Sequence, residues 1–179
     1  IGADWNQSTE DANLRALVAD GYNNISVFPS SDGASGVFDE LNQQGVNVVT
    51  YGAATSAMTE QFCVATDVQA AAQQAAEDVI QAMGGKGGIL NVLEVLSDTN
   101  TLKRKAGVEA AIAAHGGDVT LVQQVADITS IDQGTQKISA AISANPDKIN
   151  GIVCTGNVAS SSAVQVLNDY YQRNPGAAK

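Results

Sequence analysis

Short polar segments follow the apolar runs of this chain, and their side chains carry groups that bind small polar molecules. In the stretch ISVFPSSDG, an apolar run ends at Pro29 and is followed directly by Ser30, Ser31 and Asp32. Hydroxyl, amide and carboxylate groups in such a segment can hydrogen-bond a ligand, or they can cap the helix that starts next. Similar segments recur at residues 6–8, 29–33, 52–56, 66–67, 97–101, 127–130 and 155–157. Their recurrence favours a polar binding site, with helix capping as the alternative at each single segment.

Residue patterns that perform catalysis are largely missing. The chain has no Gly-x-Ser-x-Gly elbow that would expose a serine nucleophile. The glycine-rich run 84–88 precedes an apolar run instead of following one, so it predicts a turn and not a phosphate loop. Carboxylates expected near strand ends are not paired as an acid and a base; they are Asp4, Asp67, Asp98 and Asp127. These observations favour a binding protein over an enzyme, and no catalytic residue is predicted.

The single histidine and the two cysteines favour neither a metal site nor a disulfide. His115 falls at the expected end of a helix, where a partly cationic imidazole is favourable, and no Cys/His cluster accompanies it. Cys63 and Cys154 lie in separate strand-like runs, which favours two buried free thiols over a disulfide. No cofactor and no metal are therefore expected.

One basic cluster, Lys103-Arg104-Lys105, falls at the start of an expected helix after a strand. Cations are locally unfavourable at a helix N-terminus, and a solvated helix face explains two of the three. The forked guanidinium of Arg104 is also suited to hold hydroxyl or carboxylate oxygens. The residues alone leave both interpretations of Arg104 open.

Apolar runs and helical repeats alternate along the chain, and this alternation must position the polar segments. The expected strands are 1–5, 24–28, 46–51, 62–65, 89–93, 119–125 and 152–154. The expected helices are 8–20, 36–44, 67–83, 102–115, 131–144 and 158–171. Such alternation predicts an α/β fold with a parallel sheet and helices on both of its faces. Ligands of these folds bind beyond the carboxyl ends of the strands, where the polar segments fall.

Several local features carry more detailed expectations. Ser8 is expected to cap the first helix, and the run 46–51 is expected to be a strand covered on both faces. The run 84–88 is expected to be a loop. One face of the helix 67–83 is expected to carry Val68, Ala72, Ala75, Val79 and Met83.

Composition narrows the possible partners. The 179 residues are 44% hydrophobic, which is enough to build a core. The chain has 19 acidic against 9 basic residues, a net charge of -10, which disfavours nucleic acid as a partner. No apolar run is long enough to cross a bilayer. The chain begins at Ile1 without a visible signal peptide, which predicts a processed or trimmed N-terminus.

A succession of stretches covers nearly the whole chain in the order of a known family. They are DANLRALVADGYNNISVFPSSDGASG, QQGVNVVTYGAATS, VATDVQAAAQQAAEDVIQAMGGKGGILNVLE, LKRKAGVEAAIAA, QVADITSIDQGTQKISAAISANPDKINGIVCTGN and ASSSAVQVL. In this succession the chain resembles the type I periplasmic binding proteins, specifically the ribose/galactose-type sugar receptors of ABC transporters. The resemblance implies two Rossmann-like lobes with parallel sheets, joined by crossing strands, with the ligand clamped between them. Residues 1–65 would be a partial N-terminal lobe and residues 66–179 a partial C-terminal lobe, incomplete at both ends.

The resemblance also implies ligand-binding residues. Arg104 falls where family members place a ligand-holding arginine. Gly156 and Asn157 fall where an Asn-Asp pair faces the ligand, and Asn157 is the better candidate. Ser30 would line the N-terminal side of the cleft.

Other positions depart from the pattern of the family. Phe28 replaces a polar asparagine before the proline, Tyr51 and Gly52 replace an acidic-basic pair, and Ile128 replaces a stacking aromatic residue. These departures predict a ligand other than ribose, or a less polar one. Trp5, Phe28 or Tyr51 would supply a stacking face for it.

The leading hypothesis is a solute-binding receptor outside the cytoplasmic membrane, periplasmic or attached to the cell surface. It would bind a sugar or sugar-like molecule by hinge closure and would pass it to the membrane subunits of an ABC transporter. The first alternative is the effector-binding core of a lactose-repressor-type transcription regulator, which shares this fold. The second, an enzyme on a doubly wound sheet, is disfavoured by the missing catalytic patterns.

Overall fold

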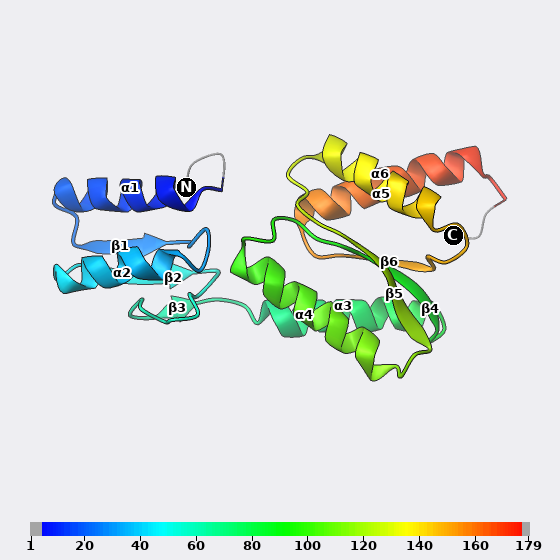
Figure 1. The fold of residues 1–179 in the computed structure, drawn as a ribbon, viewed down its shortest axis with the longest axis horizontal. Coiled ribbons are helices and arrows are strands. Elements are labelled where there is room, and N and C mark those ends of the chain that lie inside the picture. The colour runs from blue at the N-terminus through cyan, green and yellow to red at the C-terminus, as the bar shows by residue number, and fades with distance from the viewer. Residues whose placement is uncertain (1–4, 177–179) are drawn as a thin grey trace. The chain divides into compact units, whose positions relative to one another are not determined.

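The computed structural model describes residues 5–176 and divides the chain into two compact units. Unit 1 contains the residues up to Asp67 together with Ser97–Asn100, and unit 2 contains Val68–Leu96 and the residues from Thr101 onward. Figure 1 shows the elements of both units. Each unit has its own parallel sheet and its own hydrophobic core.

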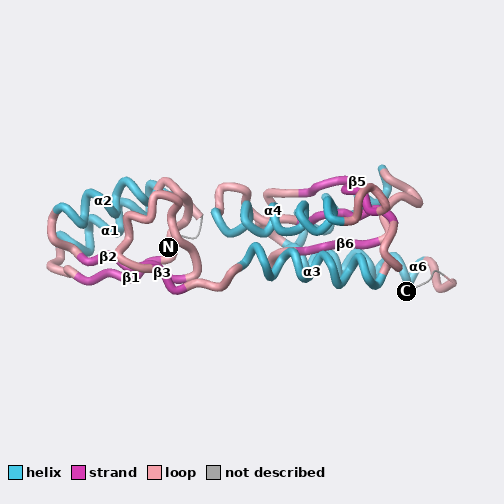
Figure 2. The backbone as a smooth tube through the Cα atoms, turned by 90° about the horizontal axis from the view of Figure 1, so that it is seen from below, coloured by secondary structure: helices cyan, strands magenta, loops and turns pink. Residues whose placement is uncertain are grey.

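Unit 1 is a three-stranded parallel sheet with two helices on one face. Its elements are α1 (Gln7–Ala19), β1 (Asn24–Val27), α2 (Ala34–Gln43), β2 (Asn47–Tyr51) and β3 (Cys63–Val64), with the strands in the order β1-β2-β3. The side chains of Ile25, Val27 and Val48 turn inward, and they pack with Leu14 and the fully buried Phe38. Figure 2 shows α1 and α2 on the same side of β1 and β2.

The other face of this sheet is not covered by a described helix. The burial of β2 alternates, so Val48 and Thr50 are buried while Asn47 and Tyr51 are exposed. The expectation that the run 46–51 is covered on both faces is therefore wrong for this structure. Alternation of this kind is typical of a strand with one packed face.

Unit 2 has helices on both faces of its sheet. Its elements are α3 (Val68–Ala82), β4 (Gly87–Val92), α4 (Thr99–Ala114), β5 (Val119–Val125), α5 (Ile131–Ala144), β6 (Gly151–Cys154) and α6 (Asn157–Arg173). The strand order is β5-β4-β6, so β4 is central and buried on both faces. One core lies between the sheet and α3 with α4, and the second lies between the sheet and α5 with α6 (Figure 1).

The local expectations fail at identifiable points. Asn6 caps α1, because its side chain accepts the N–H of Thr9 at 3.1 Å, and Ser8 lies inside the helix. Gly87 and Gly88 belong to β4 and not to the preceding loop. Of the face expected for the helix 67–83, Ala72 is buried and Val79 and Met83 pack against the core, but Ala75 is exposed, and the buried residues also include Ala76 and Ile80. The expected strand 1–5 lies outside the described residues, apart from Trp5, which is in no strand.

None of the described helices is long and apolar enough to cross a membrane.

Candidate functional site

Three aromatic side chains form a ladder at the carboxyl edge of the sheet of unit 1. The ring centroids of Trp5 and Phe28 are 5.5 Å apart with the planes at 63°, and those of Phe28 and Tyr51 are 5.9 Å apart at 72°. Such edge-to-face packing is the favourable geometry for aromatic pairs. The Tyr51 side chain is 51% exposed, whereas Trp5 and Phe28 are half-buried. Three of the predicted site residues are thus brought together, with one ring open to solvent.

Gly52 makes room for this ladder. Its φ is +76°, and a Cβ atom placed on it would lie 2.4 Å from Cε2 of Phe28. Only glycine satisfies both the left-handed backbone and the close approach of the ring.

Ser30 is held from inside the unit rather than exposed. It is 1% exposed, its N–H donates to Oε2 of Glu10 at 2.9 Å, and its hydroxyl lies 3.3 Å from Oε1 of Gln7. The hydroxyl of Ser31 donates to the same Gln7 oxygen at 2.6 Å. The segment after β1 is therefore anchored on α1.

Helix capping is not the main role of this segment. The N-cap of α2 is Gly33, which has no side chain to accept a hydrogen bond. The Asp32 carboxylate instead accepts the N–H and the hydroxyl of Ser56, each at 2.5 Å. Asp32 thus connects the loops that follow β1 and β2.

A buried carboxylate organises the loop after β2. Glu60 is 7% exposed and accepts the N–H of Thr55 at 2.9 Å and its hydroxyl at 2.7 Å. The side-chain amide of Asn100 donates to the carbonyl of Gly52 at 2.7 Å, and Asp98 accepts the N–H of Asn100 at 3.2 Å. The Tyr51–Gly52 corner is therefore fixed on several sides.

The carboxyl edge of unit 2 is also held together by carboxylates. Oε1 of Glu94, two residues after β4, accepts the N–H of Val158 in the first turn of α6 at 2.8 Å. Oδ1 of Asp127 accepts the N–H of Leu96 at 3.1 Å, and the N–H of Asp127 donates to the carbonyl of Glu94 at 2.8 Å. The Lys137 ammonium donates to the carbonyl of Asp127 at 3.0 Å. These contacts join the loops that follow β4, β5 and β6.

The predicted ligand residues of unit 2 occupy different environments. Gly156 is the N-cap of α6, Asn157 is its exposed first residue, and Arg104 is half-buried in α4. Ile128 is 1% exposed and packs in the core beside α5 and α6. Its side chain therefore has almost no surface to offer a ligand, and the ligand roles of all four residues stay predictions.

Two titratable groups of interest are perturbed by burial. Burial raises the pKa of the Glu10 carboxyl above its ordinary value of 4.5, although hydrogen bonds from Ser30 oppose the shift. Burial also raises the pKa of the Cys154 thiol to about 11. Both Cys154 and Cys63 are free thiols, but they are partly buried and not fully buried as expected.

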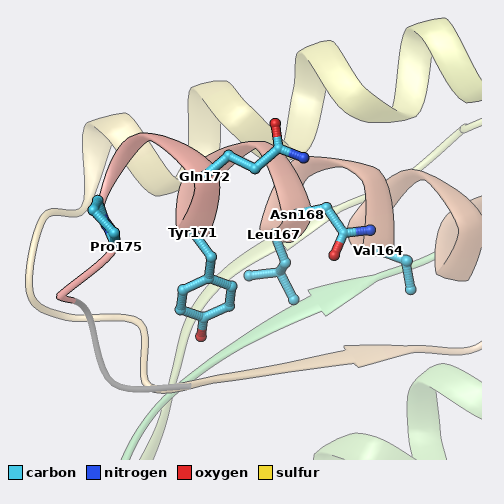
Figure 3. A pocket seen from close by; sticks show the side chains of 6 residues that line it. All are labelled: Val164, Leu167, Asn168, Tyr171, Gln172 and Pro175. Atoms are coloured by element: carbon cyan, nitrogen blue, oxygen red, sulfur yellow. The ribbon is translucent and has the colours of Figure 1, made fainter.

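The pocket drawn in Figure 3 lies away from these edges. It has a volume of about 550 Å³, and its lining comes from one face of α6 and the residues after it. Val164, Leu167 and Tyr171 project from the same side of that helix (Figure 3). None of the predicted site residues lines it. Within residues 5–176, no group of three or more His, Cys, Asp or Glu side chains is placed to hold a metal ion.

Sequence reasoning missed the carboxylates Glu10, Glu60 and Glu94. Glu10 was detectable, because it lies one helical turn before the core residue Leu14 and therefore on the buried face of α1. Glu94 directly follows the expected strand 89–93, but the polar segment was expected to start at Ser97. Glu60 lies in an irregular segment with no period that would indicate its burial.

Solved structures with the same fold include sugar-bound proteins. A solute-binding protein of an ABC transporter from Burkholderia graminis, in complex with D-arabinose, is 20% identical with a TM-score of 0.86, over 96% of this chain and 59% of that one. A periplasmic solute-binding protein of an ABC transporter from Actinobacillus succinogenes, with bound D-allose, is 19% identical with a TM-score of 0.82, over 95% and 61%.

A transcription regulator has the same fold. The Cra transcriptional dual regulator from Pseudomonas putida, in complex with fructose 1-phosphate, is 16% identical with a TM-score of 0.77, over 94% of this chain and 61% of that one. The chain thus spans about three fifths of the length of each of these three proteins. No curated protein matches the sequence.

The family assignment rests on nearly the whole chain. A family profile described as periplasmic binding protein domain matches residues 1–176. The two parallel-sheet units and the solved structures agree with this match. The chain belongs to the periplasmic binding protein domain family.

Proposed function

We propose that this chain is the ligand-binding part of an extracytoplasmic receptor that delivers a sugar or sugar-like solute to an ABC transporter. The observation that carries the proposal is the aromatic ladder of Trp5, Phe28 and Tyr51 beside fixed polar loops at the carboxyl edge of unit 1. Family membership and the sugar complexes of proteins with this fold support it.

The ladder has the chemistry of a sugar platform. A pyranose or furanose ring presents apolar C–H groups on its faces and hydroxyl groups at its rim. An aromatic ring packs on the apolar face, and nearby polar groups orient the hydroxyls. Tyr51 is the solvent-exposed ring of the ladder, so it is the residue expected to contact the ligand.

The surrounding loops are preorganised. Asp32, Glu60 and Asn100 hold the backbone around Tyr51 and Gly52 through hydrogen bonds of 2.5–2.9 Å. Less conformational entropy is lost when a ligand binds to a surface that is already ordered. The proposed role is binding without a chemical change to the ligand, and hinge closure stays a prediction.

One specific finding keeps a second candidate function open. The regulator from Pseudomonas putida has the same fold and binds fructose 1-phosphate. An effector-binding core of a transcription regulator would respond to a phosphorylated sugar, whereas the proposed receptor would respond to a neutral one. A ligand panel that contains both classes therefore separates the two functions.

The test is a thermal-shift screen against pentoses, hexoses, polyols and sugar phosphates, followed by calorimetry on any compound that binds. A neutral sugar at about 100 times its Kd should stabilise the protein by about 2.7 kcal/mol, which corresponds to a rise in Tm of about 5–10 °C. Tyr51→Ala should weaken binding about tenfold or more, through loss of the aromatic contact.

The matched control is Tyr22→Ala, because Tyr22 is 59% exposed and lies before β1, at the opposite end of that strand. This variant should bind as the wild type does. Arg104→Ala tests the arginine that the resemblance implies, and it should weaken the same ligand. A panel without any neutral-sugar response, or equal losses in the two tyrosine variants, would contradict the proposal.

A further inference from the structure

Internal carboxylates already occupy six backbone donors at the carboxyl ends of the strands. In both units, N–H groups of the loops, or of the first helical turn that follows, donate to an Asp or Glu side chain of the same unit. The pairs are Ser30 with Glu10, Thr55 with Glu60, Ser56 with Asp32, Asn100 with Asp98, Leu96 with Asp127 and Val158 with Glu94, at 2.5–3.2 Å.

These donors are the groups that hold anions in other α/β proteins. Loop N–H groups and helix N-termini bind phosphates and carboxylates, because their partial positive charge points at the ligand. Here each of the six donors already has an anionic partner that belongs to the protein. An incoming phosphate would have to displace that partner, and it would meet its negative charge as well.

Among these carboxylates, Glu94 lies at the N-terminus of α6, beside the predicted ligand residues. Its Oε1 accepts the N–H of Val158 at 2.8 Å, in the first turn of the 17-residue helix α6. A Cβ atom on Gly156 would lie 2.1 Å from Cδ of Glu94, so the carboxylate lies directly against the N-cap backbone. Gly156 and Asn157, the predicted ligand residues, are thus next to a negative charge.

The basic group of Lys137, at this edge, is engaged with backbone carbonyls. The Lys137 ammonium donates to the carbonyls of Ala126 and Asp127, at 2.7 and 3.0 Å. The net charge of the chain, -10, adds long-range repulsion of anions. A neutral polyhydroxyl ligand suffers neither penalty, and it can donate hydroxyl hydrogens to the remaining carboxylate oxygens.

We infer that Glu94 is a specificity-determining residue that closes the N-terminus of α6 to anions. Given the proposed receptor function, the ligand is a neutral polyhydroxyl compound, and the phosphorylated and acidic forms of the same sugar are rejected. Gly156 is part of this device, because a side chain there would push the carboxylate away.

The decisive variant is Glu94→Gln. Glutamine keeps the length of the side chain and an oxygen acceptor for the N–H of Val158, but it removes the charge and adds an N–H donor. Glu109→Gln is the matched control, because it removes one charge from unit 2 at a partly exposed pair in which Glu109 lies 2.7 Å from Lys105. Glu94→Ala removes both the charge and the acceptor, so the N–H of Val158 at the start of α6 loses its side-chain partner.

The first probe is inorganic phosphate, titrated at constant ionic strength while ¹H–¹⁵N NMR follows the amides of Gly156, Asn157 and Val158. In the wild type and in Glu109→Gln, these amides should show no saturable shift. In Glu94→Gln they should shift saturably. Phosphate should bind this variant at least about tenfold more tightly than it binds the wild type, because the negative charge of Glu94 is removed. Glu94→Ala should bind phosphate at least as tightly as Glu94→Gln.

Saturable phosphate binding at these amides in the wild type would overturn the inference, and so would a Glu94→Gln variant that behaves like the wild type. This arm needs no sugar, so it decides the role of Glu94 even if the proposed receptor function fails. The second arm compares a sugar found in the screen with its phosphate ester by calorimetry. The preference for the neutral sugar should fall at least about tenfold in Glu94→Gln and stay the same in Glu109→Gln.

Discussion

Gly52 and Gly156 show how single residues shape the two carboxyl edges. At Gly52 the obstacle to a side chain is the Phe28 ring, and at Gly156 it is the Glu94 carboxylate. Gly52 also has a left-handed backbone, whereas Gly156 has an extended one with φ of -161°. At position 156 a side chain would therefore meet no backbone strain, but it would displace the Glu94 carboxylate.

Glu10 should make the stability of the protein depend on pH. Burial raises the pKa of its carboxyl in the folded state above the ordinary value of 4.5, so the folded state favours the protonated form. The resulting stabilisation is present below the unfolded-state pKa and is lost as the pH rises through the raised pKa. Urea unfolding of the wild type and Glu10→Gln, from about pH 4 to 7, should show the wild type losing stability relative to the variant.

Glu40 provides a control with the opposite sign. The hydrogen bond from Arg15 lowers the pKa of its exposed carboxyl, and Nη2 of Arg15 lies 2.6 Å from Oε2 of Glu40. The wild type should therefore gain stability relative to Glu40→Gln as the pH rises over the acidic range, although weakly, because the pair is exposed. If Glu10→Gln showed the same slope as Glu40→Gln, the assignment for Glu10 would be wrong.

At the scale of elements, helix packing in unit 2 depends on small residues. Gly107 of α4 faces the backbone of α3, and a Cβ atom on it would lie 2.3 Å from the carbonyl oxygen of Gln69. Because the obstacle is backbone, it cannot rotate away as a flexible side chain would. The helices would have to separate to accommodate an alanine.

Gly107→Ala should therefore destabilise the protein by about 2 kcal/mol, although alanine favours a helix by about 1 kcal/mol over glycine. Gly36→Ala in α2 is the comparison, because a Cβ atom there meets nothing within 4 Å. It should leave stability unchanged or raise it by up to about 1 kcal/mol. Urea unfolding measures both, and equal effects would refute the packing explanation.

Element boundaries were predictable where the sequence pattern had one solution. The strand 119–125 and the helix 131–144 were predicted with the bounds that the structure has. The face of α3 was predicted only in part: Ala72 and Val79 contact the core as expected, but Ala75 does not, because alanines lie on several sides of VQAAAQQAAEDVIQA and leave the buried side ambiguous. The cap of α1 was misplaced by two residues, because both Asn6 and Ser8 are residues that cap helices.

At the scale of the whole molecule, each unit has a core made only of its own residues. The core of unit 1 contains Phe38 and Leu41 of α2, and those of unit 2 contain Ile89 and Ile138. A compact unit with its own core can unfold separately from its neighbour.

Phe38→Ala should destabilise unit 1 by about 3–5 kcal/mol, because Phe38 is fully buried and its removal leaves a cavity. Hydrogen exchange followed by mass spectrometry should show faster exchange in α1, β1, α2 and β2. The strands β4, β5 and β6 should exchange at the rate of the wild type. The reciprocal variant Ile138→Ala should accelerate exchange in unit 2 only, and an increase throughout the chain in either variant would contradict separate cores.

The sequence predicted where the polar and aromatic side chains of the candidate site would lie, but not which of its residues are buried. The sequence indicated that polar groups would lie at the carboxyl ends of the strands, because a parallel α/β sheet brings all these ends to one edge. It also singled out Phe28 and Tyr51, which the structure joins in one ladder. It did not indicate that Ser30 faces α1 or that Ile128 belongs to the core, because burial depends on which helix packs above each loop.

By itself, the sequence determined the fold class and the order of the elements, because periodicity and turn residues act locally along the chain. Only the tertiary structure decided that Glu10, Glu60 and Glu94 hold the loops. Their partners are Ser30, Thr55 and Val158. Glu94 and Val158 are 64 residues apart in sequence. A hydrogen bond over that separation forms only after β4 and β6 have paired in register, so no local pattern can reveal it.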